Sequence, residues 1–280
     1  VGGTLSPPLP PGQQRLPGVC AGGIPGRVDH KSTEPKATDL PPGTLIDNLY
    51  EVGERLGHGA FGTVYAGVQH PIGRRVAIKV LTRESTDVVR RRFLREARAA
   101  AAIDHPNVVT IHHFGFLPDG PPYIVMEYLD GWDLEHQIDK LGPLSPQRAL
   151  RLFAGCLDAL ATAHANGIVH KDLKPSNLFL SYPGEPREAL KIVDFGIAHV
   201  GAAEGEPGEL RLTEEGGIVG TPQYFAPEYI ESQLVTPALD VYQMGLIVTE
   251  ALTGTPLVNT ARMMEAVNLH VGGLTLPGEL

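Results

Sequence analysis

The chain has few cysteines, no long apolar run and no excess of positive charge, and each shortage excludes a class of protein. Only two cysteines occur among its 280 residues, Cys20 and Cys156, far apart and outside any C-x-x-C motif. We therefore expect neither a disulfide framework nor a metal site built on thiolates. The composition suits a reducing compartment such as the cytoplasm.

Apolar segments are too short to cross a membrane, and the charge balance is negative. The best candidate, Met244–Val248, is bounded by Glu250, whereas a spanning helix needs roughly 20 apolar residues. The formal net charge of -9 provides no general attraction to nucleic acid or to anionic membranes. We therefore expect no nucleic-acid partner and no membrane contact from this segment.

Proline and glycine are concentrated near the start of the chain, as in LSPPLPPGQQRLPG. Such a composition buries too little apolar surface to offset the entropy lost on ordering, so residues 1–44 are expected to form a disordered leader. The remaining residues, 45–280, are enough for one large domain or two lobes around a hydrophobic core.

The first part of this globular region is rich in predicted strands. Short β-branched and aromatic segments separated by glycines predict an antiparallel meander, followed by further strands. The strands are expected at 50–57, 61–68, 74–81, 108–117 and 121–129. Between them, residues 85–103 predict a helix with Ser85 or Thr86 as N-cap and Val89, Phe93, Ala97 and Ala100 along one face.

The second half of the chain turns helical. One helix is expected to open with Ser145 as N-cap and Pro146 at its first position, and another, DVYQMGLIVTEALTG, to end on Gly254. Apolar residues of the first helix repeat at three- and four-residue steps, at Leu150, Phe153, Leu157 and Leu160. Strands followed by helices predict an α+β fold with an N-lobe at about 45–129, a C-lobe at about 130–280 and a cleft between them.

Residues 57–64, GHGAFGTV, form a G-x-G-x-x-G-x-V motif. Glycines allow the backbone to approach phosphate groups closely and to adopt turns closed to other residues. A dinucleotide-binding site would require a helix directly afterwards, whereas TVYAGV continues as a strand. The motif therefore indicates a hairpin flap, which covers phosphates or is simply a turn.

Lys79 ends the otherwise apolar strand segment VAIK. It is either an edge lysine that reaches water or a cation held in the cleft against an anionic ligand. In the second case Glu96, on the following helix, could supply the carboxylate that holds the ammonium group in place. Taken alone, Glu96 would be an ordinary solvated helix charge.

The stretch HKDLKPSN, residues 170–177, brings a carboxylate, an ammonium group and an amide together. Asp172 can orient an attacking hydroxyl group and accept its proton. Lys174 can neutralise the transferred group, while Asn177 and Asp194 offer oxygens of the kind that magnesium prefers. Phosphoryl transfer requires in-line positioning and stabilised charge, and these groups provide both.

These motifs occur in the order of one known family. Residues 48–280 resemble the catalytic domain of eukaryotic-type (Hanks-type) Ser/Thr protein kinases, and the compact style of DVYQMGLIVTEALTG is most similar to the bacterial members. The resemblance implies the bilobal protein-kinase fold and transfer of the γ-phosphoryl group of ATP to proteins in bacterial signalling. ATP and Mg²⁺ are the implied cofactors.

The resemblance also implies a role for each motif residue. Lys79, paired with Glu96, would hold the α- and β-phosphates; Asp172 would be the catalytic base, and Asn177 and Asp194 the metal ligands. The nucleotide contacts would be the loop glycines Gly57, Gly59 and Gly62, the adenine neighbours Leu56, Val64, Ala77 and Phe179, the gatekeeper Met126, the hinge from Glu127 to Leu129, and the ribose contact Asp133.

Two features favour serine and threonine as acceptors. Lys174 in DLKPSN resembles the Ser/Thr-specific subgroup. Residues 220–228, GTPQYFAPE, resemble that subgroup's platform for the substrate peptide, and Thr221 is expected to bond to Asp172 and Lys174. If APE stood alone, an ordinary Gly/Pro loop would be the preferred interpretation.

The sequence departs from the family in its regulatory segment and at its end. Lys171 stands where most members carry an Arg that binds a phosphorylated residue through a bidentate fork, which lysine cannot reproduce. The phosphorylation candidates are Thr213 and Thr221, and we hypothesise that Glu215 pairs permanently with Lys171; the alternative is two exposed loop charges. The C-lobe is expected to be incomplete, as part of a longer parent that could carry a membrane anchor.

Two other functions remain open. A pseudokinase or scaffold would bind partners without phosphoryl transfer, and the Lys171 change and the short C-lobe support it. A small-molecule phosphotransferase would share the fold but have no use for a peptide platform. The histidines His112, His113 and His164 lack a partner set at ligand spacing, and Cys156 lies on the apolar side of a helix, so structural roles are expected for all four.

Overall fold

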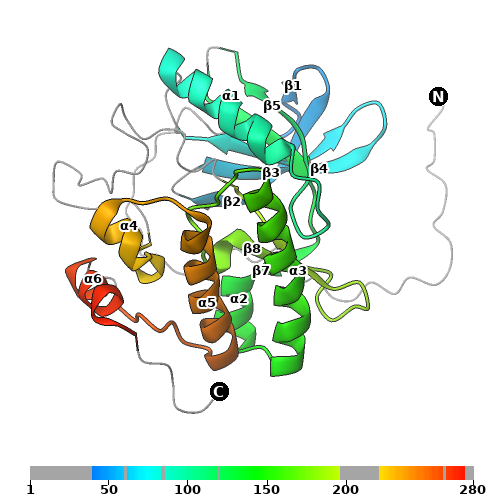
Figure 1. Cartoon of the computed structure of the whole chain (residues 1–280). Coiled ribbons are helices and arrows are strands. Elements are labelled where there is room, and N and C mark those ends of the chain that lie inside the picture. Colours follow the sequence, from blue (N-terminus) through cyan, green and yellow to red (C-terminus); the bar gives the residue numbers. More distant parts are fainter. Residues whose placement is uncertain are drawn as a thin grey trace, which may run out of the picture. The chain divides into compact units, whose positions relative to one another are not determined.

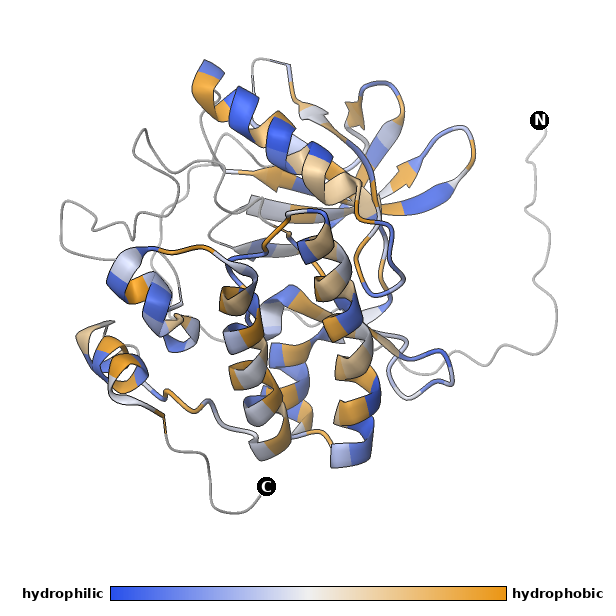
Figure 2. Ribbon diagram, viewed as in Figure 1, coloured by the Kyte–Doolittle hydropathy of each residue, from blue (hydrophilic) through white to orange (hydrophobic). Residues whose placement is uncertain are grey.

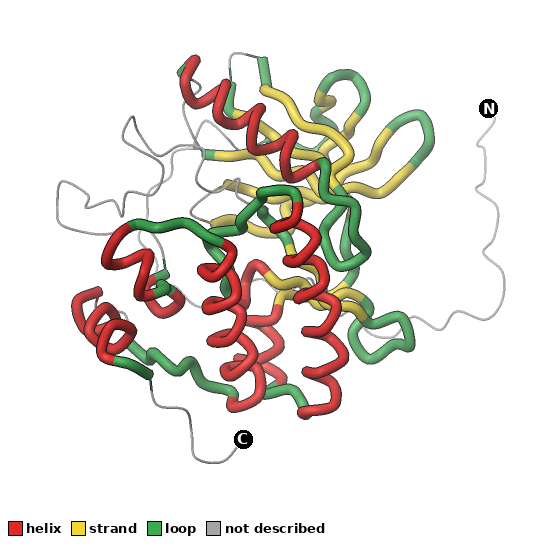
Figure 3. Tube along the Cα trace, in the orientation of Figure 1, coloured by secondary structure: helices red, strands yellow, loops and turns green. Residues whose placement is uncertain are grey.

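The computed structural model describes residues 40–59, 62–82, 86–118, 120–195, 221–260 and 263–274, which all belong to one unit, Pro35–Leu280. Within this unit the strands come mostly first and the helices second, which confirms the expected α+β class (Figures 1 and 3). Among the helices described, none has the length and apolar character that crossing a membrane requires.

Six of the described strands form one antiparallel sheet. They are β1 (Leu45–Ile46), β2 (Tyr50–Gly59), β3 (Gly62–Gln69), β4 (Arg74–Leu81), β5 (Ile111–Phe116) and β6 (Pro122–Glu127). The order β1-β2-β3-β4-β6-β5 confirms the predicted meander of β2, β3 and β4, to which the unpredicted β1 is added at the edge. β6 pairs antiparallel with β5 on one side and with β4 on the other, so β5 forms the edge of the sheet.

The helix α1 (Asp87–Ala101) packs its apolar side onto this part of the fold. The hydroxyl oxygen of Thr86 accepts a hydrogen bond from the backbone N–H of Val89 at 3.3 Å, so Thr86 is the N-cap; Ser85 lies outside the described residues. Phe93, Ala97 and Ala100 are buried as predicted. Figure 2 shows hydrophilic residues concentrated on the opposite side of α1.

The helix α3 (Pro146–Ala165) begins as predicted, but its buried face only partly coincides with the predicted one. Ser145 accepts from the N–H of Arg148 at 3.4 Å. Of the predicted apolar stripe, Phe153 and Leu160 are buried, whereas Leu150 and Leu157 are 76% and 47% exposed, so the prediction is wrong for these two. The buried stripe is Ala149, Leu152, Phe153, Cys156, Ala159, Leu160 and Ala163. The alanines in this stripe allow α3 to approach its neighbours closely. Leu150 and Leu157 lie at helical spacing from the buried residues, but on the side that faces solvent.

The helix α5 (Pro237–Thr253) starts three residues before the predicted Asp240 and ends where predicted. Gly254 follows it in the left-handed conformation, with φ of 80°, and donates its N–H to the carbonyl of Glu250. The other helical segments are α2 (Leu134–His136), η1 (Gln137–Leu141), η2 (Pro175–Asn177), η4 (Pro222–Tyr224), α4 (Pro227–Ser232) and α6 (Met263–Gly272).

A second sheet was not predicted. It contains β7 (Gly131–Asp133), β8 (Leu178–Ser181) and β9 (Ala189–Ile192), in the order β7-β8-β9. Strands of three or four residues offer too few positions for an alternating pattern to be recognised. The sheet matters for the site, because β8 follows the stretch HKDLKPSN and β9 leads into Asp194.

One cluster of buried apolar side chains joins the two lobes. It includes Phe93 and Ala100 from α1, Leu152 from α3, Leu190 from β9 and Met244 from α5. Within this shared core β9 packs on α3, which fixes the segment that leads into Asp194.

The folded region extends further toward the start of the chain than predicted. Residues 40–44 were assigned to the leader, yet Gly43 donates to the carbonyl of Val52 at 2.7 Å and the N–H of Leu40 donates to the Tyr65 hydroxyl at 3.1 Å. The rest of the predicted leader, residues 1–39, lies outside the described residues.

Candidate active site

The loop that carries Asp172 is held by α5. The carboxylate of Asp240, which is fully buried, accepts the N–H of His170 at 2.8 Å and the N–H of Lys171 at 2.9 Å. Gln243 accepts the N–H of Leu173 at 2.9 Å. These bonds hold Lys171 at φ of 73°, a left-handed conformation that residues other than glycine seldom adopt. The position of Asp172 is therefore set by buried groups.

The polar groups predicted from HKDLKPSN do meet. The ammonium nitrogen of Lys174 lies 3.0 Å from Oδ2 of Asp172, and both side chains are less than one-fifth exposed, at 17% and 13%. Asn177 is buried and donates its amide nitrogen to the carbonyl of Asp172 at 2.6 Å. Because that nitrogen faces the loop, Asn177 can present only its amide oxygen to a ligand.

Lys79 pairs with Asp194, at 2.6 Å between Nζ and Oδ2. The predicted pair with Glu96 is wrong: among the ion pairs of the described residues, Glu96 contacts Arg95 at 3.4 Å. One ammonium group pairs with whichever carboxylate comes within hydrogen-bond distance, and sequence spacing does not determine how far α1 lies from β4. Burial raises the pKa of Asp194, but the Lys79 ammonium outweighs it and holds that pKa below its usual value.

The backbone keeps the two predicted metal ligands adjacent. The N–H of Val193, which precedes Asp194, donates to the carbonyl of Asn177 at 3.0 Å. The His170 ring bonds to the carbonyl of Val193 at 3.0 Å and lies against the Phe195 ring, with centroids 4.9 Å apart. Asp194 itself has φ of 64°, a second left-handed residue of the site. Gly196 and the following residues up to Gly220 lie outside the described part.

The glycines of the hairpin differ in what the fold requires of them. Gly62 has φ of 152°, and a Cβ there would lie 2.2 Å from the carbonyl oxygen of Val80, so the fold itself requires glycine. A Cβ at Gly57 or Gly59 would meet nothing within 4 Å. Those two positions therefore leave open space that a ligand could use. Ala60 and Phe61 lie outside the described residues.

Two of the four predicted adenine neighbours, Val64 and Ala77, lie together with the predicted gatekeeper Met126. Ala77 and Met126 form a buried cluster with Val109, against which Val64, Leu129 and Val193 pack. Val109 and Val193 were not predicted. Leu56 is half-buried on β2, and Phe179 on β8 pairs across the small sheet with Asp133, the predicted ribose contact. Asp133 caps α2 by accepting from His136 at 2.7 Å, and burial raises its pKa.

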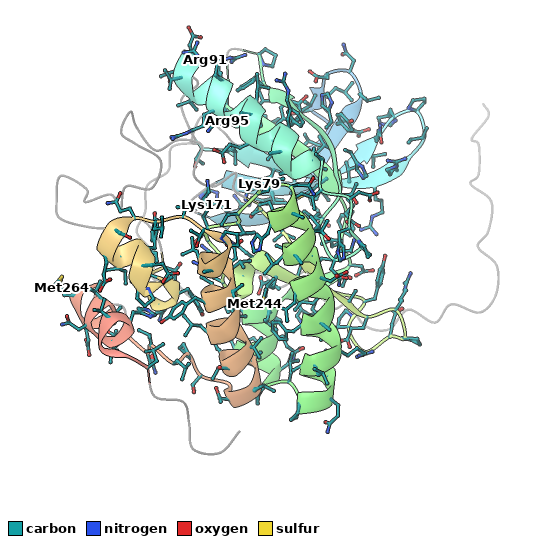
Figure 4. The ribbon with its side chains drawn as sticks, viewed as in Figure 1. Lys79, Arg91, Arg95, Lys171, Met244 and Met264 are labelled. Atoms are coloured by element: carbon teal, nitrogen blue, oxygen red, sulfur yellow. The ribbon has the colours of Figure 1, made fainter. Side chains whose placement is uncertain are left out.

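The hinge residue Glu127 is anchored by a lysine that the sequence did not single out. Its Oε1 atom accepts the N–H of Thr110 at 2.8 Å and the ammonium group of Lys191 at 2.7 Å. Lys191 lies on β9, three residues before Asp194. In Figure 4, Lys79 and Lys171 lie in the zone of the drawing between α1 and α5.

The predicted substrate platform, residues 220–228, is described from Thr221 onward and includes the turn η4. Thr221 is half-buried and accepts the N–H of Tyr224 through its carbonyl at 3.1 Å; its bonds to Asp172 and Lys174 stay a prediction. The Tyr224 hydroxyl donates to Oε2 of Glu250 on α5 at 2.6 Å, and burial and that carboxylate raise the pKa of Tyr224. Thr213 and Glu215 lie outside the described residues.

Two of the three histidines expected to be structural, and Cys156, form contacts of that kind, while the role of His112 stays a prediction. His164 bonds to Asp240 at 2.8 Å and His113 to Asp47 at 3.2 Å. Cys156 is fully buried and donates to the carbonyl of Leu190. Asp240 and Gln243 could have been found as polar residues three apart in the mainly apolar helix α5.

Comparison with known proteins agrees with this geometry. Residues 50–275 match the family model described as "Protein kinase domain". The serine/threonine-protein kinase PknB of Mycobacterium tuberculosis is 40% identical over 219 residues, which cover 75% of this chain and 33% of that protein. The serine/threonine-protein kinase PrkC of Bacillus subtilis is 36% identical over 214 residues, 76% of this chain and 31% of that protein.

A further relative is the probable serine/threonine-protein kinase pknA2 of Bifidobacterium longum, which is 34% identical over 235 residues, 82% of this chain and 30% of that protein. The chain thus spans about a third of the length of these curated relatives.

Proposed function

The chain belongs to the protein kinase domain family, and on that premise we propose that it transfers the γ-phosphoryl group of ATP to serine and threonine hydroxyl groups of proteins. The observation that carries this proposal is the contact between Asp172, Lys174 and Asn177 in one loop, beside the Lys79–Asp194 pair. Phosphoryl transfer requires these groups within a few ångströms of one another.

In the proposed reaction Asp172 accepts the proton of the substrate hydroxyl group. The hydroxyl oxygen then forms a bond to the γ-phosphorus while the bond between that phosphorus and the β–γ bridging oxygen breaks, so ADP leaves with the electron pair. Lys174, 3.0 Å from Asp172, neutralises negative charge on the transferred group. The α5 contacts of the loop hold both side chains in position, which reduces the entropy lost at the transition state.

Asn177 and Asp194 have the donor chemistry for Mg²⁺, which prefers oxygen ligands. Asn177 can present its amide oxygen, and Asp194 remains ionised because Lys79 lowers its pKa. When bound, the metal neutralises phosphate charge. Lys79 would then exchange part of its contact with Asp194 for the α- and β-phosphates of ATP.

The nucleotide base would lie against the cluster of Val64, Ala77, Met126 and Leu129, with Leu56 and Phe179 as further apolar neighbours. Gly57 and Gly59 leave room above the phosphates, and Asp133 would contact the ribose. The backbone of the hinge, anchored through Glu127, would bond to the adenine ring.

Proteins with serine or threonine are the proposed substrates, in bacterial signalling and in the cytoplasm. The names of the relatives PknB and PrkC support this, and Lys174 and the GTPQYFAPE segment agree with it. Those relatives are about three times as long as the matched region. We therefore also propose that a longer parent protein carries further domains and a membrane anchor.

Incubation with γ-³²P-ATP, Mg²⁺ and a generic basic protein tests the proposal. We expect label on serine and threonine of that protein, and its loss in Asp172→Asn. ATP binding without transfer in the wild-type chain would favour a scaffold. Transfer to small alcohols but not to protein would favour a small-molecule phosphotransferase.

A further inference from the structure

His270 on α6 connects the turn η4 to the helix α5. It is 2% exposed, and both of its ring nitrogens have partners. Nε2 lies 3.0 Å from the carbonyl oxygen of Pro222, the residue after Thr221, and Nδ1 lies 2.9 Å from the hydroxyl oxygen of Tyr242 on α5. The Tyr242 and His270 rings also pack edge to face, with centroids 5.9 Å apart.

The chemistry of these partners determines where the proton of His270 lies. A carbonyl oxygen can only accept, so Nε2 must carry the hydrogen that bonds to Pro222. In the neutral ring Nδ1 is then an acceptor, and the Tyr242 hydroxyl donates to it. Burial lowers the pKa of His270, which agrees with the neutral form. Tyr242 thus fixes the tautomer that bonds to the turn, as outer hydrogen bonds do for other histidines.

The turn is held from two sides by α5. Tyr224 bonds directly to Glu250 at 2.6 Å, and Pro222 is reached indirectly through His270 and Tyr242. The direct bond fixes the end of the turn, whereas the histidine fixes its beginning, next to Thr221. The Pro222 carbonyl also accepts the N–H of Phe225 within the turn, at 3.3 Å, so His270 supplies the bond that ties this carbonyl to α6.

We propose that His270 is a positioning residue for the protein substrate: it holds the Pro222 carbonyl, and with it the turn η4 of the substrate platform, in the conformation that receives the acceptor peptide. The inference rests on the proposed function. His270 does not touch the reacting atoms, so it acts on binding of the peptide and not on ATP or on the chemical step.

Three variants separate this role from a general effect on folding. His270→Leu removes both hydrogen bonds, and His270→Gln keeps an N–H at about the position of Nε2 and can still donate to Pro222. Tyr242→Phe retains the ring packing but removes the bond that fixes the tautomer. Leu269→Ala is the matched control, because Leu269 is the neighbouring residue on α6 and is 42% exposed.

The readouts are the KM for a serine peptide, the KM for ATP, kcat and Tm. We expect His270→Leu to raise the peptide KM about tenfold, the factor for one buried hydrogen bond, while the KM for ATP and kcat change less than about twofold. His270→Gln should restore most of the loss, Tyr242→Phe should give an intermediate peptide KM, and Leu269→Ala should match the wild type.

Two results would overturn the inference. One is a peptide KM that is unchanged in His270→Leu; the other is an equal change in the KM for peptide and for ATP in His270→Leu and His270→Gln alike. If the wild-type chain transferred no phosphate to protein, the proposed function would fail and this inference with it. If the wild type is active and the His270 variants keep its KM for the peptide, the inference alone is contradicted.

Discussion

The ammonium group of Lys79 lies 2.6 Å from a carboxylate oxygen of Asp194, which joins two residues 115 positions apart in the chain. Their side chains are 11% and 23% exposed, so the pair is only partly screened by water. It links β4 of the first lobe to the end of β9. The lysine and the proposed metal ligand are thereby within reach of the same phosphate groups.

A double-mutant cycle tests this pair. Lys79→Met, Asp194→Asn and the double variant should show a coupling free energy of unfolding of about 1–3 kcal/mol, since each single change leaves a partly buried charge without its partner. The measurement is urea denaturation at pH 7. A parallel cycle of Lys79→Met with Glu96→Gln is the control and should give coupling near zero. Strong coupling to Glu96 and none to Asp194 would contradict the structure.

Substitutions of the hairpin glycines should separate stability from nucleotide binding. Gly62→Ala should lower the Tm, because its Cβ would lie 2.2 Å from a backbone oxygen. Gly57→Ala should leave the Tm within about 1 °C and raise the KM for ATP, because its Cβ enters space that the protein does not fill. Thermal unfolding and ATP kinetics check both. A Gly57→Ala enzyme with wild-type KM for ATP would argue against a phosphate role for this position.

Lys191 should contribute to nucleotide affinity through the hinge. Lys191→Met removes the 2.7 Å bond to Glu127, so the KM for ATP should rise about fivefold, while the KM for peptide is maintained. Lys140→Met, at an exposed lysine of η1, is the control and should behave as wild type. Equal effects of the two substitutions would show that the Glu127 contact is irrelevant to ATP.

Glu188 should make stability depend on pH below neutrality. Its carboxylate is 2% exposed and lies 2.6 Å from Arg148 and 2.7 Å from Arg151. Burial would raise the pKa of Glu188, but the bonds from Arg148 and Gly184 and the charges of both arginines hold it below its usual 4.5. The folded form therefore gains stability from the ionised carboxylate above about pH 4.5, and loses it as pH falls through the lowered pKa.

The corresponding measurement is thermal unfolding of wild type and Glu188→Gln between pH 7 and pH 3, from which the free energies of unfolding are compared. At pH 7 the variant should be less stable by about 1–3 kcal/mol, and the difference should shrink as pH falls below about 4.5. A gap that stayed constant over this range would mean that the ionised carboxylate is not the stabilising form.

Sequence reasoning succeeded where the chemistry is local. Asp172, Lys174 and Asn177 lie within six residues, so their contact follows from one loop, and the Gly57–Gly62 hairpin follows from the strands on either side. The residues that hold these groups are distant in the chain: Asp240 is 70 positions from His170, and Lys191 is 64 positions from Glu127. No periodic pattern encodes contacts at such separations.

Helix rotation was the other source of error. On α3 the leucines Leu150 and Leu157 share a face that is exposed, and the chain instead buries a neighbouring stripe that combines large residues such as Phe153 with alanines. Close packing against β9 and α5 depends on volume as well as hydrophobicity. On α1 the buried face was predicted correctly, but the distance from Glu96 to Lys79 depends on how α1 sits against the sheet, which composition does not determine.

The central claim is that Asp172 acts on the substrate hydroxyl in a phosphoryl-transfer site. The most direct measurement is kcat for phosphorylation of a serine peptide in wild type and Asp172→Asn, with ATP affinity determined on the same samples. We predict a loss in kcat of at least about 100-fold, typical of removing a general base, with ATP affinity within about threefold of wild type. An Asp172→Asn variant that phosphorylates the peptide at the wild-type rate would contradict the claim.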